Sequence, residues 1–294
     1  MNRFLYVLVY VPAFLVALLP FRILFLISDF FYLILFYLVR YRRKLVKMNL
    51  QNAFPDKTST EIRKIEKDFY RHFCDYFFET IKLLHISDSE IKKHITLKNK
   101  EPLQHILDKK QPVVLYLGHY GNWEWIPSLS LQVNLDADTV FGQIYRPLKN
   151  KTFDRFFLHI RKRFNTVNLT KHNVYRDIVN IRKENKNWIL GFMSDQKPSG
   201  NQIPYRMQFL NQETPILTGT EKIARHTGAA VCYLDMTRIK RGYYEVAALI
   251  IFDNASEISE FEITEKYIRC LEQTIQRNPA FYLWTHNRWR LKNK

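Results

Sequence analysis

His119 and Glu124 are the pair of side chains in this sequence that best suits general-base catalysis. They lie five positions apart, directly after the apolar stretch Val113–Leu117. An imidazole that takes a proton from a hydroxyl, oriented by a carboxylate, acts as a general base. The same spacing also fits a loop histidine followed by a solvated helix carboxylate. Because the sequence has no Gly-x-Ser-x-Gly nucleophile turn, the expected attacking group is a hydroxyl of the substrate.

Short apolar runs that alternate with helical patterns would position this pair. Val113–Leu117 is expected to be a buried strand, with His119 on the loop beyond it and Glu124 one turn into the next helix. Such alternation predicts an α/β fold, a mixed sheet flanked by helices. The other expected strands are 139–145, 166–169, 188–193, 229–236 and 243–252, and the expected helices are 122–131, 149–164, 174–183 and 262–276, with a further helix opened by Thr214 and Pro215 and ending at His226 before Gly228.

The amino-terminal part of the chain is predicted to attach to a membrane. From Phe4 to Val39 only Arg22 and Asp29 are charged, although prolines interrupt the run. A span needs about 20 apolar residues, so one kinked span and an apolar hairpin in the interface both remain open, as does a buried helix pair of a soluble fold. We therefore divide the chain into a membrane segment, 1–39, and one domain, 40–294.

A long amphipathic helix is predicted between these two parts. Thr58 and Glu61 form a capping box, and apolar residues recur at helical spacing from Ile62 to about Leu84. We expect this helix, 58–84, to pack against the amino-terminal helices or the core.

The net charge indicates an anionic partner. The 294 residues carry 45 Lys and Arg against 28 Asp and Glu, a formal charge of +17, which suits nucleic acid, an anionic membrane or a phosphorylated substrate. Five basic residues between Arg40 and Lys47 follow the apolar segment and favour the cytoplasmic side. Three scattered cysteines suit a reducing compartment, and the nine histidines show no metal-ligand spacing, so no metal is expected.

Several short motifs follow one another along the chain, and they include a His-x4-Glu motif. They are Tyr41-Arg42-Arg43-Lys44 with Asn49 and Phe54-Pro55, Gly118-His119-x4-Glu124, Tyr145-Arg146-Pro147, Asp195-Gln196, Thr214 and Thr218, and Trp284-Thr285-His286-x-Arg288. In these motifs and their order the chain resembles the bacterial lipid A biosynthesis acyltransferases, the late lauroyl/myristoyl-type enzymes within the wider lysophospholipid acyltransferase group. Asn165, Asn211 and Asn287 depart from the family pattern, and Asn165 should still accept a left-handed turn.

The resemblance implies transfer of a fatty acyl chain from a thioester to a hydroxyl of a membrane lipid. His119 would be the base and Glu124 its orienting partner, while Asn122 or nearby backbone N–H groups would meet the oxyanion. The other expected binding residues are Arg146, Arg161 and Arg163, as phosphate ligands, and Asp195 and Gln196, which follow a predicted strand. His286 and Arg288 are expected to hold the carboxyl-terminal tail on the domain.

The resemblance also implies the partners of the enzyme. The expected acceptor is a phosphorylated lipid A precursor of lipopolysaccharide synthesis, at the cytoplasmic face of the inner membrane. The donor would be acyl carrier protein or a CoA thioester, with no further cofactor. Alternatives are a lysophospholipid or aminolipid acyltransferase and a membrane-bound ester hydrolase. A non-catalytic basic binding protein is disfavoured because no nucleic-acid-binding motif occurs, so nucleic acid is not expected as a partner. The oligomeric state stays open.

Overall fold

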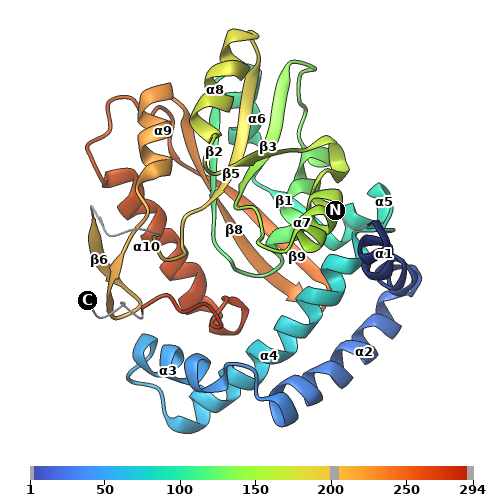
Figure 1. Ribbon diagram of the computed structural model, residues 1–294. Coiled ribbons are helices and arrows are strands. Elements are labelled where there is room, and N and C mark those ends of the chain that lie inside the picture. Colours follow the sequence, from blue (N-terminus) through green and yellow to red (C-terminus); the bar gives the residue numbers. More distant parts are fainter. Residues whose placement is uncertain (1–2, 199–204, 290–294) are drawn as a thin grey trace.

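The computed structural model describes residues 3–198 and 205–289, and in these the core is a mixed sheet of seven strands (Figure 1). The ends of the two expected parts, residues 1–2 and 290–294, lie outside the described residues. The strand order is β1-β9-β8-β2-β5-β3-β4, in which β9 runs antiparallel to β8. The strands are β1 Ile95–Lys98, β2 Val113–Leu117, β3 Thr139–Tyr145, β4 Val167–Thr170, β5 Asn187–Met193, β8 Ala230–Lys240 and β9 Tyr243–Phe252.

Helices cover both faces of this sheet. Strand β2 is buried along its whole length, and its side chains alternate between the faces. Tyr116 stacks on Tyr267 of helix α10 (Glu262–Arg277), whereas Leu115 and Leu117 face the 3₁₀ segment η2 (Trp123–Gln132) across a small apolar cavity. A parallel strand enclosed on both faces needs such a continuous apolar run, so β2 is predictable from its residues.

The remaining segments connect the strands and close the sheet. A hairpin of β6 (Arg206–Phe209) and β7 (Gln212–Pro215) stands apart from the main sheet and turns through Leu210 and Asn211, both at positive φ. The other helices are α5 Asp88–His94, α6 Glu101–Asp108, α7 Lys151–Arg161, α8 Val174–Lys183 and α9 Gly219–Thr227, with short 3₁₀ turns η3 Arg163–Asn165 and η4 Pro279–Phe281.

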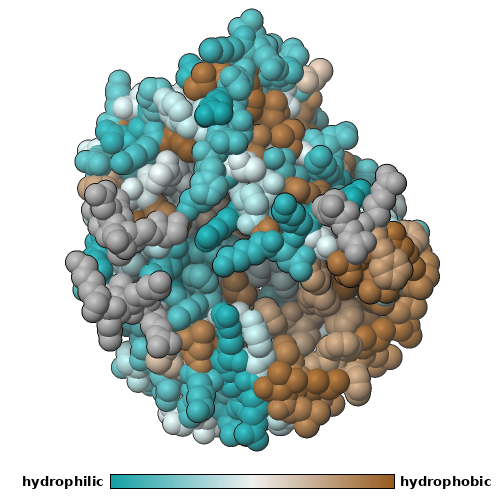
Figure 2. All heavy atoms as spheres, viewed as in Figure 1, coloured by the Kyte–Doolittle hydropathy of each residue, from teal (hydrophilic) through white to brown (hydrophobic). Residues whose placement is uncertain are grey.

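The amino-terminal helices lie along one side of the domain, against the long helix α4 (Ser59–Lys82), as Figure 1 shows. They are α1 Arg3–Leu18, α2 Phe21–Leu33, the π-helical η1 Ile34–Val39 and α3 Arg43–Ala53. Within the described residues, Phe21–Val39 is the segment long and apolar enough to cross a membrane, with a mean hydropathy of 2.0. Figure 2 shows apolar surface gathered over α1 and α2.

Most of the predicted elements are present, with one clear error. Strands 139–145 and 243–252 and helix 174–183 have the predicted bounds, and Gly228 ends its helix at φ +63°. Thr214 and Pro215 do not open a helix, because they pair with Met207 and Arg206 in the β6–β7 hairpin. Helix α9 begins instead at Gly219, after Thr218. Asn165 takes the left-handed conformation that was expected of it.

The capping box at the start of α4 gives a test of how this long helix is held. The Thr58 hydroxyl accepts from the Glu61 N–H, and the Glu61 carboxylate accepts from the Thr58 N–H at 2.8 Å. We expect Thr58→Ala to lower the free energy of unfolding by about 1 kcal/mol, since one N–H loses its partner. Urea unfolding in detergent would measure it. Thr60→Ala, the same substitution at an exposed residue of the same turn, is the matched control; an equal loss in both variants would contradict the capping role.

Candidate active site

The ends of two neighbouring strands bring His119 and Asp195 together. Leu117 of β2 pairs with Met193 of β5, and each functional residue follows two positions later. The imidazole Nδ1 lies 2.7 Å from Asp195 Oδ1, and the His119 N–H donates to Asp195 Oδ2 at 3.1 Å. Because an ionised carboxylate only accepts, Nδ1 carries the hydrogen, and Nε2 keeps a lone pair suited to a base.

The second ring nitrogen meets Gln196. Its amide Nε2 lies 3.0 Å from His119 Nε2 and donates to the lone pair there. The His119 side chain is only 14% exposed, and what remains exposed faces a cavity. Any group that approaches this ring nitrogen from the cavity would have to displace the Gln196 amide.

Charges around Asp195 keep it ionised. Its side chain is 1% exposed, and burial alone would raise the pKa of the carboxyl. Hydrogen bonds and charge from His119, followed by the guanidinium of Arg288, outweigh that effect, so the pKa of Asp195 is lowered. Arg288 is itself buried, and none of its guanidinium nitrogens has a hydrogen-bond partner among the described residues. Its positive charge therefore acts on the Asp195 carboxylate and helps to keep it ionised.

The carboxyl-terminal segment fixes the loop that carries His119. Leu283 N–H donates to the His119 carbonyl at 3.1 Å, and Gly121 N–H donates to the Phe281 carbonyl at 2.9 Å. On the other loop, the Lys197 N–H donates to His286 Nε2 at 3.3 Å. The carboxyl-terminal segment is therefore hydrogen-bonded to the loop of His119 and to the loop of Asp195. We had expected it only to pack on the domain.

Residues near the start of the domain hold this segment in turn. Arg42 donates to the Thr285 carbonyl at 2.9 Å, and the Asn49 amide donates to the carbonyls of Trp284 and His286 at 2.9 and 3.2 Å. The first and last motifs of the sequence therefore form one structural support behind the site.

Glu124 does not orient His119, so that prediction is wrong. The carboxylate is buried and forms a two-pronged ion pair with Arg161, whose Nε lies 2.8 Å from Oε2. The local helix is 3₁₀ from Trp123 on, and the Trp123 ring packs edge-on against the imidazole on that side. Nδ1 faces the adjacent strand β5 instead, so a carboxylate distant in sequence is nearer in space.

Asn122 does not face the cavity either. Its side chain is fully buried, and its amide donates to Glu79 of helix α4 at 2.8 Å. The hydroxyl of Tyr244 donates to the same carboxylate at 2.8 Å. The expected oxyanion contact from the Asn122 amide is therefore wrong, and the residue joins the loop that carries His119 to α4.

The cavity beside His119 is large and positively charged. It has a volume of about 1000 Å³ and opens over the ends of β3 and β5. Its described lining contains no carboxylate, and its cationic side chains are Arg146, Lys149, Arg161, Lys171, Lys197 and Lys222. This lining suits a phosphorylated ligand.

Some of the predicted binding residues line this cavity and others do not. Arg146 and Gln196 line the cavity, and Arg161 lines it while paired with Glu124. Arg163 lies elsewhere, because its guanidinium donates to the carbonyls of Leu83 and Ile86. Three further lysines of the lining were not predicted: Lys149, Lys171 and Lys222. Lys149 follows β3, Lys171 follows β4, and Lys222 lies in the first turn of α9, so their places after strands and at a helix start are the one feature that could have indicated them.

The Glu124–Arg161 pair can be tested as a structural element. The side chains are 2% and 18% exposed, so Glu124→Ala leaves a largely buried guanidinium without its counter-charge. We expect a loss of about 3–5 kcal/mol in the free energy of unfolding. Glu184→Ala, which breaks the exposed pair with Lys186, should leave the urea midpoint unchanged. An unaltered midpoint in Glu124→Ala would refute the structural role.

The buried carboxyl group of Glu79 predicts how the stability of the fold depends on pH. Burial is the main cause that raises its pKa to about 7, with Asp75 adding to it. Between the pKa of the unfolded chain, about 4.3, and pH 7 the folded state thus binds the extra proton, and stability falls as pH rises. Glu79→Gln keeps a neutral side chain, so its stability relative to the wild type should improve by about 3 kcal/mol from pH 4.5 to pH 8. Paired unfolding curves at several pH values would measure this, and a constant difference would contradict it.

Comparison with known proteins identifies the family of the chain. Residues 1–291 match the family described as bacterial lipid A biosynthesis acyltransferase. The chain is similar to the lipid A biosynthesis palmitoleoyltransferase of Escherichia coli (strain K12) and to a lipid A biosynthesis acyltransferase of Shigella flexneri. Each is 21% identical over 253 residues, which cover 85% of this chain and 79% of the relative. The chain therefore belongs to the bacterial lipid A biosynthesis acyltransferases, and it is an acyltransferase.

Proposed function

We propose that His119 is the general base that deprotonates a hydroxyl of a lipid A precursor, which then attacks an acyl thioester. The observation that carries this is the 2.7 Å contact between Nδ1 and Asp195, which leaves Nε2 as a base at a cationic cavity. Asp195 takes the orienting role that the sequence had suggested for Glu124.

The reaction follows from this arrangement. The hydroxyl displaces the Gln196 amide and gives its proton to Nε2, while its oxygen attacks the thioester carbon. The tetrahedral intermediate carries a negative oxygen, which the cations lining the cavity stabilise. As the intermediate collapses, the carbon–sulfur bond breaks, and the imidazolium returns its proton to the departing thiolate. Asp195 stabilises the imidazolium throughout and takes no proton.

The cavity lining supports a phosphorylated acceptor. Arg146 and Lys149 lie on the exposed loop between β3 and α7, and Lys171 follows the neighbouring strand β4, where its N–H donates to the Tyr145 carbonyl at 2.9 Å. An arginine fork and lysine charges are the usual partners of phosphate oxygens. The thioester donor is an acyl carrier protein or CoA, both of which are anionic.

The same loop supports access from a membrane. Leu148 lines the cavity and is 44% exposed, and Phe153 on α7 is 46% exposed. Helix α7 packs on α1, where the Arg155 guanidinium lies 4.5 Å from the Tyr6 ring centre. The cavity therefore opens beside the apolar helices. We place the enzyme at the cytoplasmic face of the inner membrane, as the basic run 40–47 suggests.

Activity measurements test His119 as the base and Asp195 as its orienting carboxylate. We expect His119→Ala to reduce kcat by about 10²–10⁴-fold, because the base is lost. Asp195→Asn should reduce kcat to a similar extent, because the amide no longer selects the Nδ1–H tautomer. Acyl transfer from acyl carrier protein or CoA to a lipid A precursor, followed by mass spectrometry, is the assay. Full activity in His119→Ala would remove the base from the mechanism.

Two controls accompany that assay. Each variant must unfold at the wild-type urea concentration, so that loss of fold is separated from loss of the base. The products must also be analysed, since a free fatty acid as main product would identify a hydrolase and contradict acyl transfer. An acylated lysophospholipid in place of lipid A would overturn the proposed acceptor alone.

A further inference from the structure

The three amino-terminal helical segments α1, α2 and η1, here called the anchor, expose a broad apolar face. Large apolar side chains on all three are exposed, and in Figure 2 the apolar surface is concentrated where Figure 1 places α1 and α2. The most exposed are Phe4, Leu8, Leu15, Leu26, Phe30, Leu38 and Val39, each between 59% and 77%. A soluble protein rarely exposes so continuous an apolar surface, so this face meets a membrane or another protein.

The opposite stripe of α2 and η1 packs on the domain from the first turn to the last. Phe21 stacks on His94 of α5 at 4.1 Å between ring centres. In the middle, Leu24 is buried and the buried Ser28 hydroxyl donates to Asp75 of α4 at 2.7 Å. At the far end Phe36 is fully buried beneath the Arg43 guanidinium. The helix is thus held along its length and is not a detached tether.

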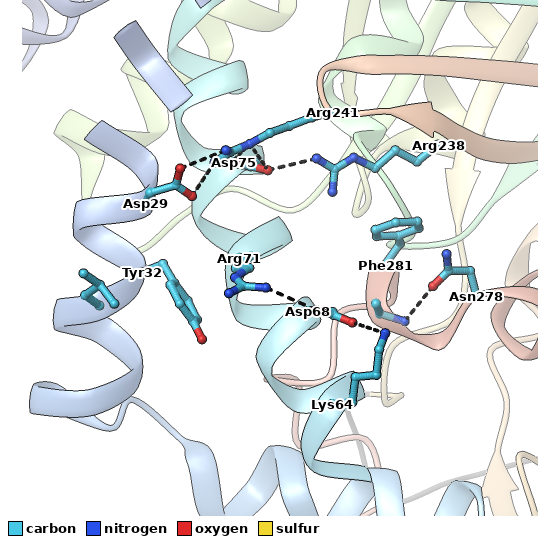
Figure 3. A pocket seen from close by; sticks show the side chains of 12 residues that line it. Asp29, Tyr32, Lys64, Asp68, Arg71, Asp75, Arg238, Arg241, Asn278 and Phe281 are labelled. Atoms are coloured by element: carbon cyan, nitrogen blue, oxygen red, sulfur yellow. Dashed lines mark hydrogen bonds and ion pairs between the residues drawn. The ribbon is translucent and has the colours of Figure 1, made fainter. Parts of the chain in front are cut away.

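A charged cleft lies beside the middle of this segment. Figure 3 shows Asp29 of α2 facing Arg241. Arg241 also forms an ion pair with Asp75, and Arg238 forms a second ion pair with the Asp75 carboxylate. These ion pairs are 2.7–2.9 Å long. The cleft has a volume of about 640 Å³, and its further charged lining is Lys64, Asp68 and Arg71.

Helix α1 is fastened to the same helix α4. The buried Lys82 donates its ammonium hydrogens to the carbonyls of Ala17 and Leu19, at 3.0 and 2.8 Å. The chain then turns at Pro20 into α2. A cation at a helix carboxyl end is favourable, because it meets the free carbonyls there.

This packing decides between the two membrane arrangements that the sequence left open. The 19 residues Phe21–Val39 would reach about 28 Å, enough to cross the hydrocarbon. If the docked helix crossed, however, the cleft beside Asp29 would enter the middle of the bilayer with seven charged side chains. Charges there are strongly unfavourable, and so is lipid contact with an open polar cleft.

We infer that the anchor lies in the plane of one leaflet and does not cross the bilayer, so that the amino terminus stays on the side of the catalytic domain. The partner is an anionic lipid surface. Exposed basic residues border the apolar face at both ends: Arg22 and Arg155 at one, and Arg40, Lys44 and Lys47 at the other. Apolar burial combined with basic residues at the headgroup level is the pattern of an interfacial helix.

The sidedness of the two chain ends tests this inference. The full chain would carry one protease-cleavable epitope before Met1 and a different one after Lys294, and membrane vesicles of both orientations would be treated with protease. We expect both epitopes to be cut in vesicles of one orientation and both to be protected in the other. One epitope cut while the other is protected, in either orientation, would mean that the anchor crosses the bilayer.

Vesicle binding tests the exposed face separately. Leu26→Glu and Phe30→Glu place charges on the lipid side, and should reduce binding to vesicles of phosphatidylglycerol and phosphatidylethanolamine at least tenfold. Leu249→Glu is the matched control, because Leu249 is an exposed apolar residue of β9, outside the anchor. Its binding should be unchanged. Unaltered binding in the anchor variants, or wild-type dimers that form through this face in the absence of lipid, would assign the face to protein contact and overturn the inference.

Discussion

The hydrogen bond between His119 Nδ1 and Asp195 fixes the geometry of the candidate active site. It exists because β2 and β5 are neighbours in register, so that residues two positions beyond Leu117 and Met193 meet. Parallel strands place their carboxyl ends at one edge, where α/β folds commonly hold ligands. His119, Asp195 and the cationic cavity all lie at that edge.

Much of the remaining molecule serves to hold these two loops. The segment from Phe281 to Arg288 hydrogen-bonds both, and Arg42 and Asn49 hold that segment from the start of the domain. Glu124 and Asn122, close to His119 in sequence, instead join the loop to Arg161 and to Glu79 of α4. Helix α4 also holds the anchor through Asp75 and Lys82, so one helix contacts both the loop of His119 and the exposed apolar face.

Local patterns predicted the elements that local physics determines. The continuous apolar run of β2, the capping box of α4 and the stop at Gly228 need only neighbouring residues, and each is present. The orienting acid could not be found in this way, because the strand order brings Asp195 across 76 residues while Glu124 is only five away. Likewise Thr214 and Pro215 resemble a helix start, but their pairing partners lie in β6. The cavity's lysines come from separate loops and share no motif.

The position of the hydrogen on the His119 imidazole shows whether Asp195 or Glu124 orients the ring. Nitrogen-15 spectra of the protein with labelled histidine, in which the His119 signals are assigned by their loss in a His119→Gln variant, report which ring nitrogen bears the hydrogen. We expect the Nδ1–H tautomer near neutral pH, with a change of tautomer in Asp195→Asn and none in a Glu124 variant that remains folded. An Nε2–H tautomer in the wild type, or a signal that responds to Glu124 and not to Asp195, would contradict it.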